Sequence, residues 1–225
     1  SPIMSTFNPS TRFWLKSAVA AGVGGGLASL SRLAAAQGAA IVEGTQFRAI
    51  NPAQPTEAPD KIEVIEFFWF GCPHCAMLEP VLREWVRKLP SDVAFRKVHV
   101  PFNEVKHQQL YYALVNMGKA DDATLEKIFD AIHKERNHLD TVGAMTAFMP
   151  KLGIDAKAFK DSYESFAVTT LMRKATAMAS AYKVDSVPML AINGKYMTAP
   201  SMAGSTGGAL MVAEQLIQRE RKARG

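Results

Sequence analysis

Two cysteines, Cys72 and Cys75, stand three positions apart in the stretch FFWFGCPHCAMLEP, and they are the only cysteines in the chain. A structural zinc site needs about four ligands, and beyond these thiols the chain offers five scattered histidines. Covalent haem attachment needs a histidine directly after the second cysteine, where Ala76 stands. A purely structural disulfide would close a very short loop and stabilise the fold little. The pair therefore favours thiol–disulfide redox chemistry, with metal binding as the alternative.

The residues next to Cys72 favour its thiolate, which is the attacking species in disulfide exchange. The apolar spacing predicts a helix from Pro73 to Leu89, so Cys72 lies at its first turn, where unpaired N–H groups and the helix dipole favour an anion. Pro73 suits the first helical position because its missing N–H costs nothing there. His74, when protonated, adds a positive charge beside the sulfur. Cys75 lies one turn into the helix, so we expect it to be the more buried, resolving thiol.

The elements that must position this pair are a strand, a helix and a second strand. The β-branched and aromatic run from Ile62 to Phe70 predicts a central strand covered on both faces. A second strand is expected from Val93 to Val100, and the short separation predicts a right-handed parallel unit. Pro80 should kink the intervening helix near Ala76. The apolar side chains of that helix at helical spacing are Met77, Val81, Leu82, Trp85, Val86 and Leu89.

The middle of the chain, from about residue 104 to residue 182, lacks a convincing strand and is predicted to be helical. Glycine stops at Gly118 and Gly153 and a cap at Asp155 punctuate it. After it, Asn193-Gly194 predicts a type I′ hairpin turn, and STGGALMVAEQLIQRE predicts a closing helix. This order predicts an α/β sandwich with a helical domain inserted into it.

The first 36 residues differ from the rest, because they contain three cations and no acidic residue. A positive end at Arg12 and Lys16, a small apolar stretch and an A-x-A site at 34–36 are typical of a secretory signal peptide. Ser1-Pro2-Ile3 before Met4 is interpreted as a non-native leader. Without residues 1–36 the formal charge falls from +5 to +2, which gives nucleic-acid binding little support. An oxidising compartment is expected.

The CPHC sequence after an apolar strand resembles the DsbA family of periplasmic thiol oxidases, within the thioredoxin superfamily, over essentially the whole chain after residue 36. This resemblance implies an α/β, thioredoxin-like fold with an inserted all-helical domain, divided as 37–104, 105–177 and 178–225. It also implies a periplasmic thiol oxidase without metal or organic cofactor, acting as a monomer. Its partners would be folding secreted proteins and a DsbB-like, quinone-linked inner-membrane protein that reoxidises it.

The resemblance also assigns individual residues. Cys72 corresponds to the attacking thiol, Cys75 to the resolving thiol, and Pro73 and His74 to the dipeptide that tunes them. Val187 and Pro188, in DSVPMLAINGKY, correspond to a valine and a cis-proline that present backbone groups to substrate. Glu66 corresponds to an acidic residue beneath the site, with Lys97 as its basic partner and His99 nearby. Glu66 could relay protons to Cys75 or form only a structural ion pair, whereas His99 is more often a packed histidine.

Two departures from the best-known member concern the loop before Cys72. Gly71 stands where that member has an aromatic residue, and Trp69 is also a change, so substrate preference is open. A disulfide isomerase or reductase is the alternative within redox chemistry. Isomerases of this kind resemble dimers with an N-terminal dimerisation domain, for which the roughly 25 residues between Gln37 and the first strand are too few. A metal carrier that uses the CxxC pair is the alternative from another class.

Overall fold

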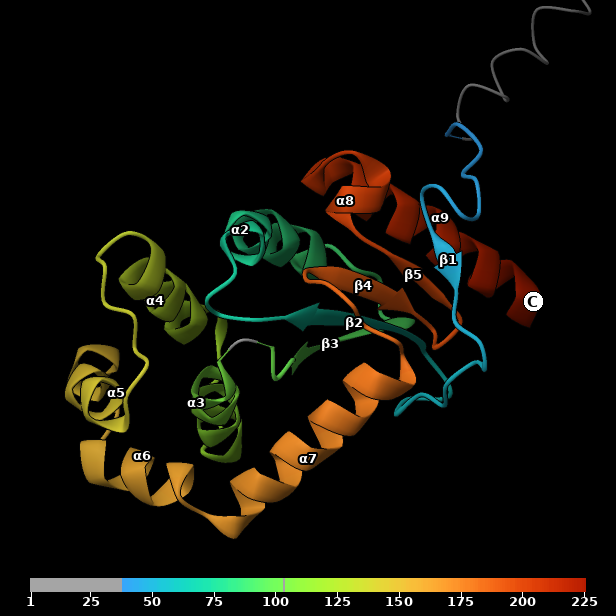
Figure 1. The fold of residues 1–225 in the computed structure, drawn as a ribbon. Coiled ribbons are helices and arrows are strands. Elements are labelled where there is room, and N and C mark those ends of the chain that lie inside the picture. Colours follow the sequence, from blue (N-terminus) through green and yellow to red (C-terminus); the bar gives the residue numbers. More distant parts are fainter. Residues whose placement is uncertain (1–37, 103) are drawn as a thin grey trace, which may run out of the picture. The chain divides into compact units, whose positions relative to one another are not determined.

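A five-stranded mixed sheet, with the order β1-β5-β4-β2-β3, forms the centre of the computed structural model (Figure 1). β2 lies between β4 and β3, and all seven of its residues are buried, as the sequence predicted for a doubly covered strand. β2 pairs in parallel with β3, with Ile62 opposite Val93 and Phe68 opposite His99, and antiparallel with β4. The strands are β1 (Arg48–Ala49), β2 (Ile62–Phe68), β3 (Val93–His99), β4 (Met189–Ile192) and β5 (Tyr196–Thr198).

Alternate residues of β2 face two different layers. Ile62 and Val64 belong to a cluster packed against α2 (Pro73–Arg87) and α9 (Thr206–Arg224). Ile65 and Phe67 belong to the cluster that includes α3 (Val105–Asn116) and α7 (Phe166–Ala181). Figure 1 shows α2, α8 (Pro200–Ala203) and α9 on one side of the sheet and α3 and α7 on the other. Because the side-chain period of a strand is two, Glu66 lies on the same face as Ile62 and Val64, toward α2.

The helical prediction for the middle of the chain is confirmed. Asp121 and Asp155 accept hydrogen bonds as N-caps, and Gly118 and Gly153 have φ of 66° and 69°. The stretch after Asp155 is two helices, because Ser165 caps a new one by accepting from the Val168 N–H. The elements are α3 (Val105–Asn116), α4 (Asp122–His133), α5 (Val142–Phe148), the 3₁₀ turn η1 (Met149–Leu152), α6 (Ala156–Tyr163) and α7 (Phe166–Ala181).

The expected hairpin and closing helix are also confirmed. Asn193 and Gly194 both have positive φ, 52° and 66°, as a type I′ turn requires. An added Cβ at Gly194 would lie 2.0 Å from the Gln54 carbonyl oxygen, so no other residue fits this turn without movement. The sequence missed β1 and α8, which are only two and four residues long.

Three predictions about the strands and the active-site helix need correction. β2 ends at Phe68, two residues before Phe70, because the Phe70 N–H donates to the His99 side chain instead of a neighbouring strand. β3 ends at His99, one residue before Val100. On α2, Met77 and Val81 are not core residues, because they are 63% and 42% exposed. The helix continues through Pro80 to Arg87.

The structure describes residues 38–102 and 104–225, so the expected leader and signal peptide at 1–36 lie outside the described residues. The sheet and all the helices above belong to one compact unit, Ala40–Gly225. The domain boundary expected after residue 177 falls inside α7, which ends at Ala181. Within the described ranges, no helix has the length and apolar character needed to span a membrane.

Candidate active site

Cys72 is the N-cap residue of α2, with Pro73 as the first helical residue. Its backbone is extended, and its Sγ accepts a hydrogen bond from the Cys75 N–H at 3.4 Å. The Cys72 carbonyl oxygen accepts from the Ala76 N–H at 3.1 Å, as the first bond of the helix. A sulfur in this position caps free N–H groups that would otherwise be unsatisfied, and these groups favour its negative form.

The two thiols have opposite pKa shifts. The pKa of Cys72 is lowered to about 6, and the largest cause is a hydrogen bond from the Cys75 thiol. The backbone N–H groups of Cys75 and His74 and the charge of His74 also lower this pKa, whereas burial raises it. Burial raises the pKa of the Cys75 thiol far above its usual value, and Cys72 and Glu66 raise it further. Both cysteines are free and buried, with Cys75 fully enclosed. The pair therefore combines an ionisable outer thiol with an inner thiol that keeps its proton.

The loop before β4 approaches Cys72 from the opposite side. The Val187–Pro188 peptide bond is cis, as the resemblance predicted. The Cys72 thiol lies 3.6 Å from the Val187 carbonyl oxygen, within reach of an S–H donor. Pro188 is buried and Val187 is half-buried. Residues 115 positions apart in the sequence thus meet at the sulfur.

A charged cluster lies beneath the cysteines. The Lys97 ammonium contacts Glu66 at 2.5 Å and Glu79 at 2.7 Å, and both carboxylates are buried. Burial is the largest cause that raises the pKa of Glu66 to about 7, against the charge of Lys97. Burial alone would lower the pKa of Lys97, but the two carboxylates raise it above its usual value. Glu66 Oε1 has no partner among residues 38–102 and 104–225, so one face of this carboxyl is available for a proton.

Glu79 also belongs to this charged cluster, although the sequence did not predict it. It stands four positions after Cys75 in α2, and residues four apart share a face of a helix. That spacing was a usable signal, because it places an acidic side chain on the same buried face as the inner thiol. The expected pairing of Glu66 with Lys97 is found.

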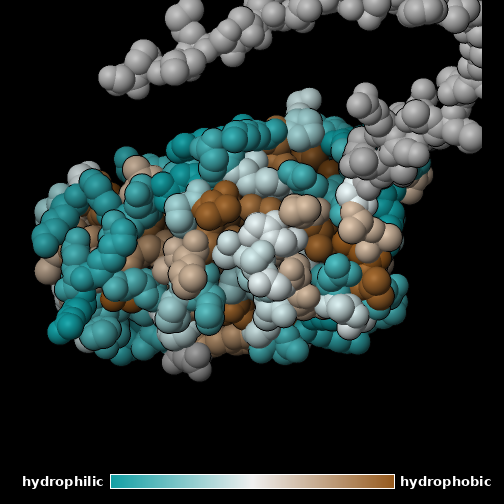
Figure 2. Space-filling model, turned by 90° about the horizontal axis from the view of Figure 1, so that it is seen from above, coloured by the Kyte–Doolittle hydropathy of each residue, from teal (hydrophilic) through white to brown (hydrophobic). Residues whose placement is uncertain are grey.

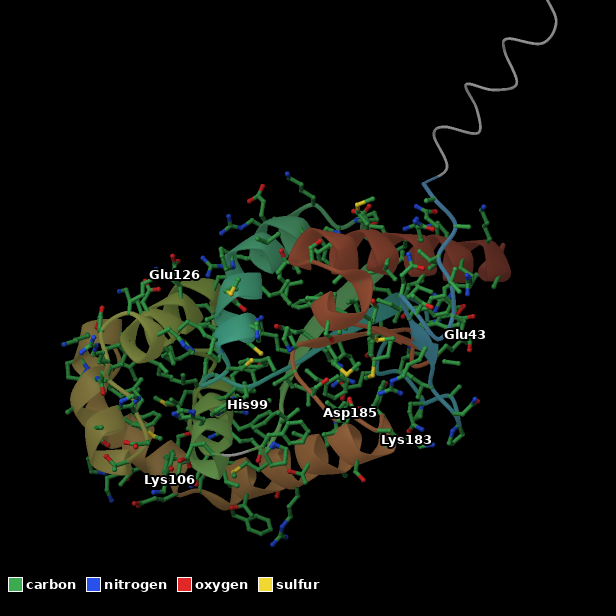
Figure 3. The ribbon with its side chains drawn as sticks, turned by 45° about the horizontal axis from the view of Figure 1, so that its top comes forward. Glu43, His99, Lys106, Glu126, Lys183 and Asp185 are labelled. Atoms are coloured by element: carbon green, nitrogen blue, oxygen red, sulfur yellow. The ribbon has the colours of Figure 1, made fainter. Side chains whose placement is uncertain are left out.

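His99 is a packed histidine, as the sequence interpretation favoured, and it lies inside the molecule next to α3 (Figure 3). Its Nε2 accepts from the Phe70 N–H at 3.1 Å, so its Nδ1 carries the proton and donates to the Val100 carbonyl oxygen at 2.8 Å. Burial lowers the pKa of His99 to about 3. A ring that is neutral and bonded at both nitrogens is suited to holding backbone rather than to moving protons.

Trp69 and Gly71, the two departures from the best-known member, contact each other. An added Cβ at Gly71 would lie 2.2 Å from the Trp69 ring, so the indole occupies the space that a side chain at position 71 would need. The indole N–H donates to His107 Nδ1 at 3.0 Å. The two changes are therefore one structural feature, in which the tryptophan ring covers a glycine next to Cys72.

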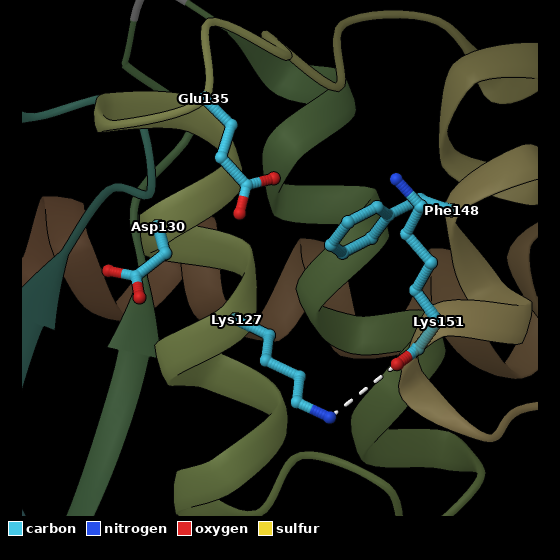
Figure 4. Close-up of a pocket in the computed structure, with 5 residues that line it drawn as sticks. All are labelled: Lys127, Asp130, Glu135, Phe148 and Lys151. Atoms are coloured by element: carbon cyan, nitrogen blue, oxygen red, sulfur yellow. Dashed lines mark hydrogen bonds between the residues drawn. The ribbon is translucent and has the colours of Figure 1, made fainter.

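Two further features lie on the surface. Figure 2 shows apolar residues in the middle of the face that carries α2 and α8, and Met77 and Val81 are exposed apolar side chains of α2. A pocket between α4 and the α5–η1 segment has a mixed lining, and none of its residues belongs to the site (Figure 4). It is lined by Lys127, Asp130, Glu135, Phe148 and Lys151. In the described part of the chain, no three His, Cys, Asp or Glu side chains are grouped as metal ligands.

Comparison with known proteins places these features in a family. Residues 63–206 match the family model described as a DSBA-like thioredoxin domain. The chain is 38% identical to the thiol:disulfide interchange protein DsbA of Burkholderia cepacia, over 83% of this chain and 89% of that protein. It is 41% identical to the DsbA of Bordetella parapertussis, over 79% and 85%. The crystal structure of Pseudomonas aeruginosa DsbA superimposes with a TM-score of 0.79 at 37% identity, covering 82% of this chain and 96% of that one.

Proposed function

The chain belongs to the DsbA family of thiol:disulfide interchange proteins, and from this we propose that it is a thiol oxidase that donates the Cys72–Cys75 disulfide to folding proteins in the periplasm. It is an oxidoreductase with a thioredoxin-like fold, and proteins are its substrates in disulfide exchange. The observation that carries the proposal is the pair of opposite pKa shifts at the two thiols. A thiolate that is stable in the reduced protein makes the disulfide a stronger oxidant.

The reaction takes place in two exchanges. A substrate thiolate attacks Cys72 Sγ in the oxidised protein, the Cys72–Cys75 bond breaks, and Cys75 leaves as a thiolate. A second substrate thiolate then attacks the substrate sulfur of the mixed disulfide, and Cys72 leaves with the electron pair. Two substrate thiols are oxidised to a disulfide, and the protein disulfide is reduced to a dithiol. Cys72 is a good leaving group in this second exchange, because its pKa of about 6 is below that of an ordinary thiol.

The departing Cys75 thiolate needs a proton, and we assign Glu66 as its source. Glu66 has a pKa raised to about 7 chiefly by burial, so it holds a proton in much of the population near neutral pH. The negative charge of Glu66 raises the pKa of Cys75, which supports this assignment. Lys97 keeps the carboxyl from being permanently neutral, because its charge favours the ionised form. Pro73 and His74 favour the Cys72 thiolate. Pro73 starts the helix, and the charge of His74 lowers the pKa of Cys72.

Val187 and Pro188 are the proposed substrate-binding residues. The Val187 carbonyl oxygen lies 3.6 Å from Cys72 Sγ, so an extended substrate chain that pairs with this backbone would bring its own cysteine to Cys72. Backbone pairing suits an enzyme with many clients, since it does not depend on the side chains of the substrate.

The remaining partners are proposed on the basis of family membership. A DsbB-like, quinone-linked inner-membrane protein would return the reduced enzyme to its disulfide form, and the enzyme would act as a monomer. The proposed division of the mature chain has thioredoxin-like segments at 37–104 and 178–225 around the helical insertion at 105–177.

Oxidation of a reduced, unfolded protein tests the proposed function directly. The oxidised enzyme is mixed with a twofold excess of a reduced substrate protein that has two cysteines, and the thiols of both proteins are trapped by acid and alkylation. The proposal expects the substrate to gain one disulfide for each enzyme disulfide that is lost, and Cys72→Ser to be inactive. Cys75→Ser, pre-charged at Cys72 with a small thiol, should release that thiol and accumulate a mixed disulfide with a substrate variant that has one cysteine, because no second thiol is present to displace Cys72. A wild-type enzyme that leaves the substrate reduced would contradict the proposal.

A further inference from the structure

Three histidines hold the loop that precedes Cys72, here called the active-site loop (residues 69–71). His99 accepts the Phe70 N–H at 3.1 Å, and His133 donates from Nε2 to the Phe70 carbonyl oxygen at 2.7 Å. His107 accepts the Trp69 indole N–H at 3.0 Å. These histidines come from β3, α4 and α3, so three separate elements converge on a short piece of backbone.

His133 differs from the other two in its place and its bonding. It is the last residue of α4, and its ring stacks on Phe129, with centroids 6.1 Å apart. Phe129 in turn packs edge-on against Phe70, at 5.3 Å. The end of α4 therefore meets Phe70 twice, once through an aromatic contact and once through a hydrogen bond to its carbonyl oxygen.

The backbone that His133 holds leads directly to the reactive sulfur. The Trp69 carbonyl oxygen accepts from the Cys72 N–H at 3.1 Å, so the loop closes as a turn onto Cys72. Between Phe70 and Cys72 stands Gly71, whose backbone has more freedom than that of any other residue type. With the N–H and the carbonyl of Phe70 both bonded, the peptide that enters Gly71 has one orientation, and the position of Cys72 over the start of α2 is fixed.

We propose that His133 is a positioning residue for thiol–disulfide exchange: its hydrogen bond to the Phe70 carbonyl fixes the active-site loop and so favours the Cys72 thiolate and the reduced enzyme. This inference rests on the proposed function. It makes the inserted helical region a determinant of the redox balance, because α4 belongs to that region. The residue acts through the backbone and does not itself touch the substrate.

A matched pair of substitutions separates the hydrogen bond from packing. His133→Gln keeps an N–H donor near the position of Nε2, whereas His133→Met has a similar length and no donor. His138→Gln is the control, because that histidine has an exposed side chain and, within 38–102 and 104–225, a hydrogen bond only at its backbone oxygen. For each full-length protein, the thiolate absorbance near 240 nm is titrated with pH, and the ratio of reduced to oxidised enzyme is measured in a fixed glutathione buffer.

We expect His133→Met to raise the pKa of Cys72 by roughly half a unit and to lower the reduced-to-oxidised ratio about threefold. The two changes correspond, because half a pKa unit is about a threefold change in an equilibrium constant. His133→Gln and His138→Gln should stay close to wild type. If His133→Met does not fold, His133→Phe, which keeps a ring against Phe129, makes the same comparison with His133→Gln. Unchanged values in the donor-free variant, or equal shifts in the donor-free and Gln variants, would overturn the inference. A wild-type ratio typical of a reductase would instead overturn the proposed function, and the ratio between variants would still test His133.

Discussion

Lys97 is the cation on which the buried charges beneath the cysteines depend, and Lys97→Met tests that dependence. Its ammonium lies 2.5 Å from Glu66 and 2.7 Å from Glu79, and both carboxylates are buried. Removing one partner of a buried ion pair costs about 3–5 kcal/mol, because it leaves an uncompensated charge. We therefore expect Lys97→Met to lower the free energy of unfolding by about 3–5 kcal/mol at pH 8.

The cost should shrink at acid pH, since a buried carboxyl without its cation takes up a proton. Holding a carboxyl with an ordinary pKa of 4.5 protonated at pH 8 costs about 5 kcal/mol, at about 1.4 kcal/mol per pH unit. At pH 5 the same protonation costs only about 1 kcal/mol. Between pH 4.5 and pH 8 the native variant binds more protons than the unfolded chain, so its stability falls as the pH rises. Wild type should fall less steeply, because Lys97 keeps the pKa of Glu66 near 7.

Urea unfolding followed by circular dichroism at pH 5 and pH 8 measures both effects. The matched control is the triple variant Glu66→Gln, Glu79→Gln, Lys97→Met, which removes all three charges together and should recover most of the stability lost at pH 8. The reasoning is refuted if Lys97→Met costs less than about 1 kcal/mol at pH 8, or if its cost is the same at both pH values.

Three further predictions concern Cys72 and the loop before it. In the reduced protein the thiolate absorbance should appear with a midpoint near pH 6. Cys75→Ala should move this midpoint upward because it removes the thiol donor, whereas Cys75→Ser keeps a donor and should not. A wild-type midpoint of 8 or more would contradict the assignment of Cys72 as a stabilised thiolate. The same depressed pKa should raise the free energy of unfolding of the reduced protein by up to about 4 kcal/mol at pH 9. This contribution should be lost as the pH falls from 9 to 6, and it should be absent in Cys72→Ala. Gly71→Ala should lower the unfolding free energy by about 1–3 kcal/mol through its collision with the Trp69 ring. In a Trp69→Ala background it should cost much less, and a full cost there would show that the two positions are independent.

The parts of the structure that the sequence predicted are those determined by local patterns. The continuous apolar run of β2, the Asn193-Gly194 turn and the caps at Asp121 and Asp155 all depend on neighbouring residues. The reactive pair was predictable for the same reason, because the start of a helix next to Cys72 can be identified from Pro73 and the spacing that follows. The cis bond before Pro188 was expected only through the resemblance to a known family.

The parts that were missed depend on contacts between distant segments. Met77 and Val81 have the spacing of a buried helix face, but they are on the exposed side of α2. Glu79 is buried because Lys97, on a neighbouring strand, supplies its countercharge, and a single segment does not reveal that partner. The bond between His133 and the Phe70 carbonyl joins residues 63 positions apart, and no local pattern predicts it.

The reduction potential of the Cys72–Cys75 pair is the measurement that tests the central claim most directly. The mature chain is equilibrated with glutathione buffers of known ratio, and the reduced fraction is determined by trapping the thiols. A Cys72 thiolate stabilised at the start of α2 predicts a potential above that of protein disulfide isomerase, about −180 mV. A potential near that of thioredoxin, about −270 mV, would mean that the reduced form is not stabilised, and would identify a reductase instead of an oxidase.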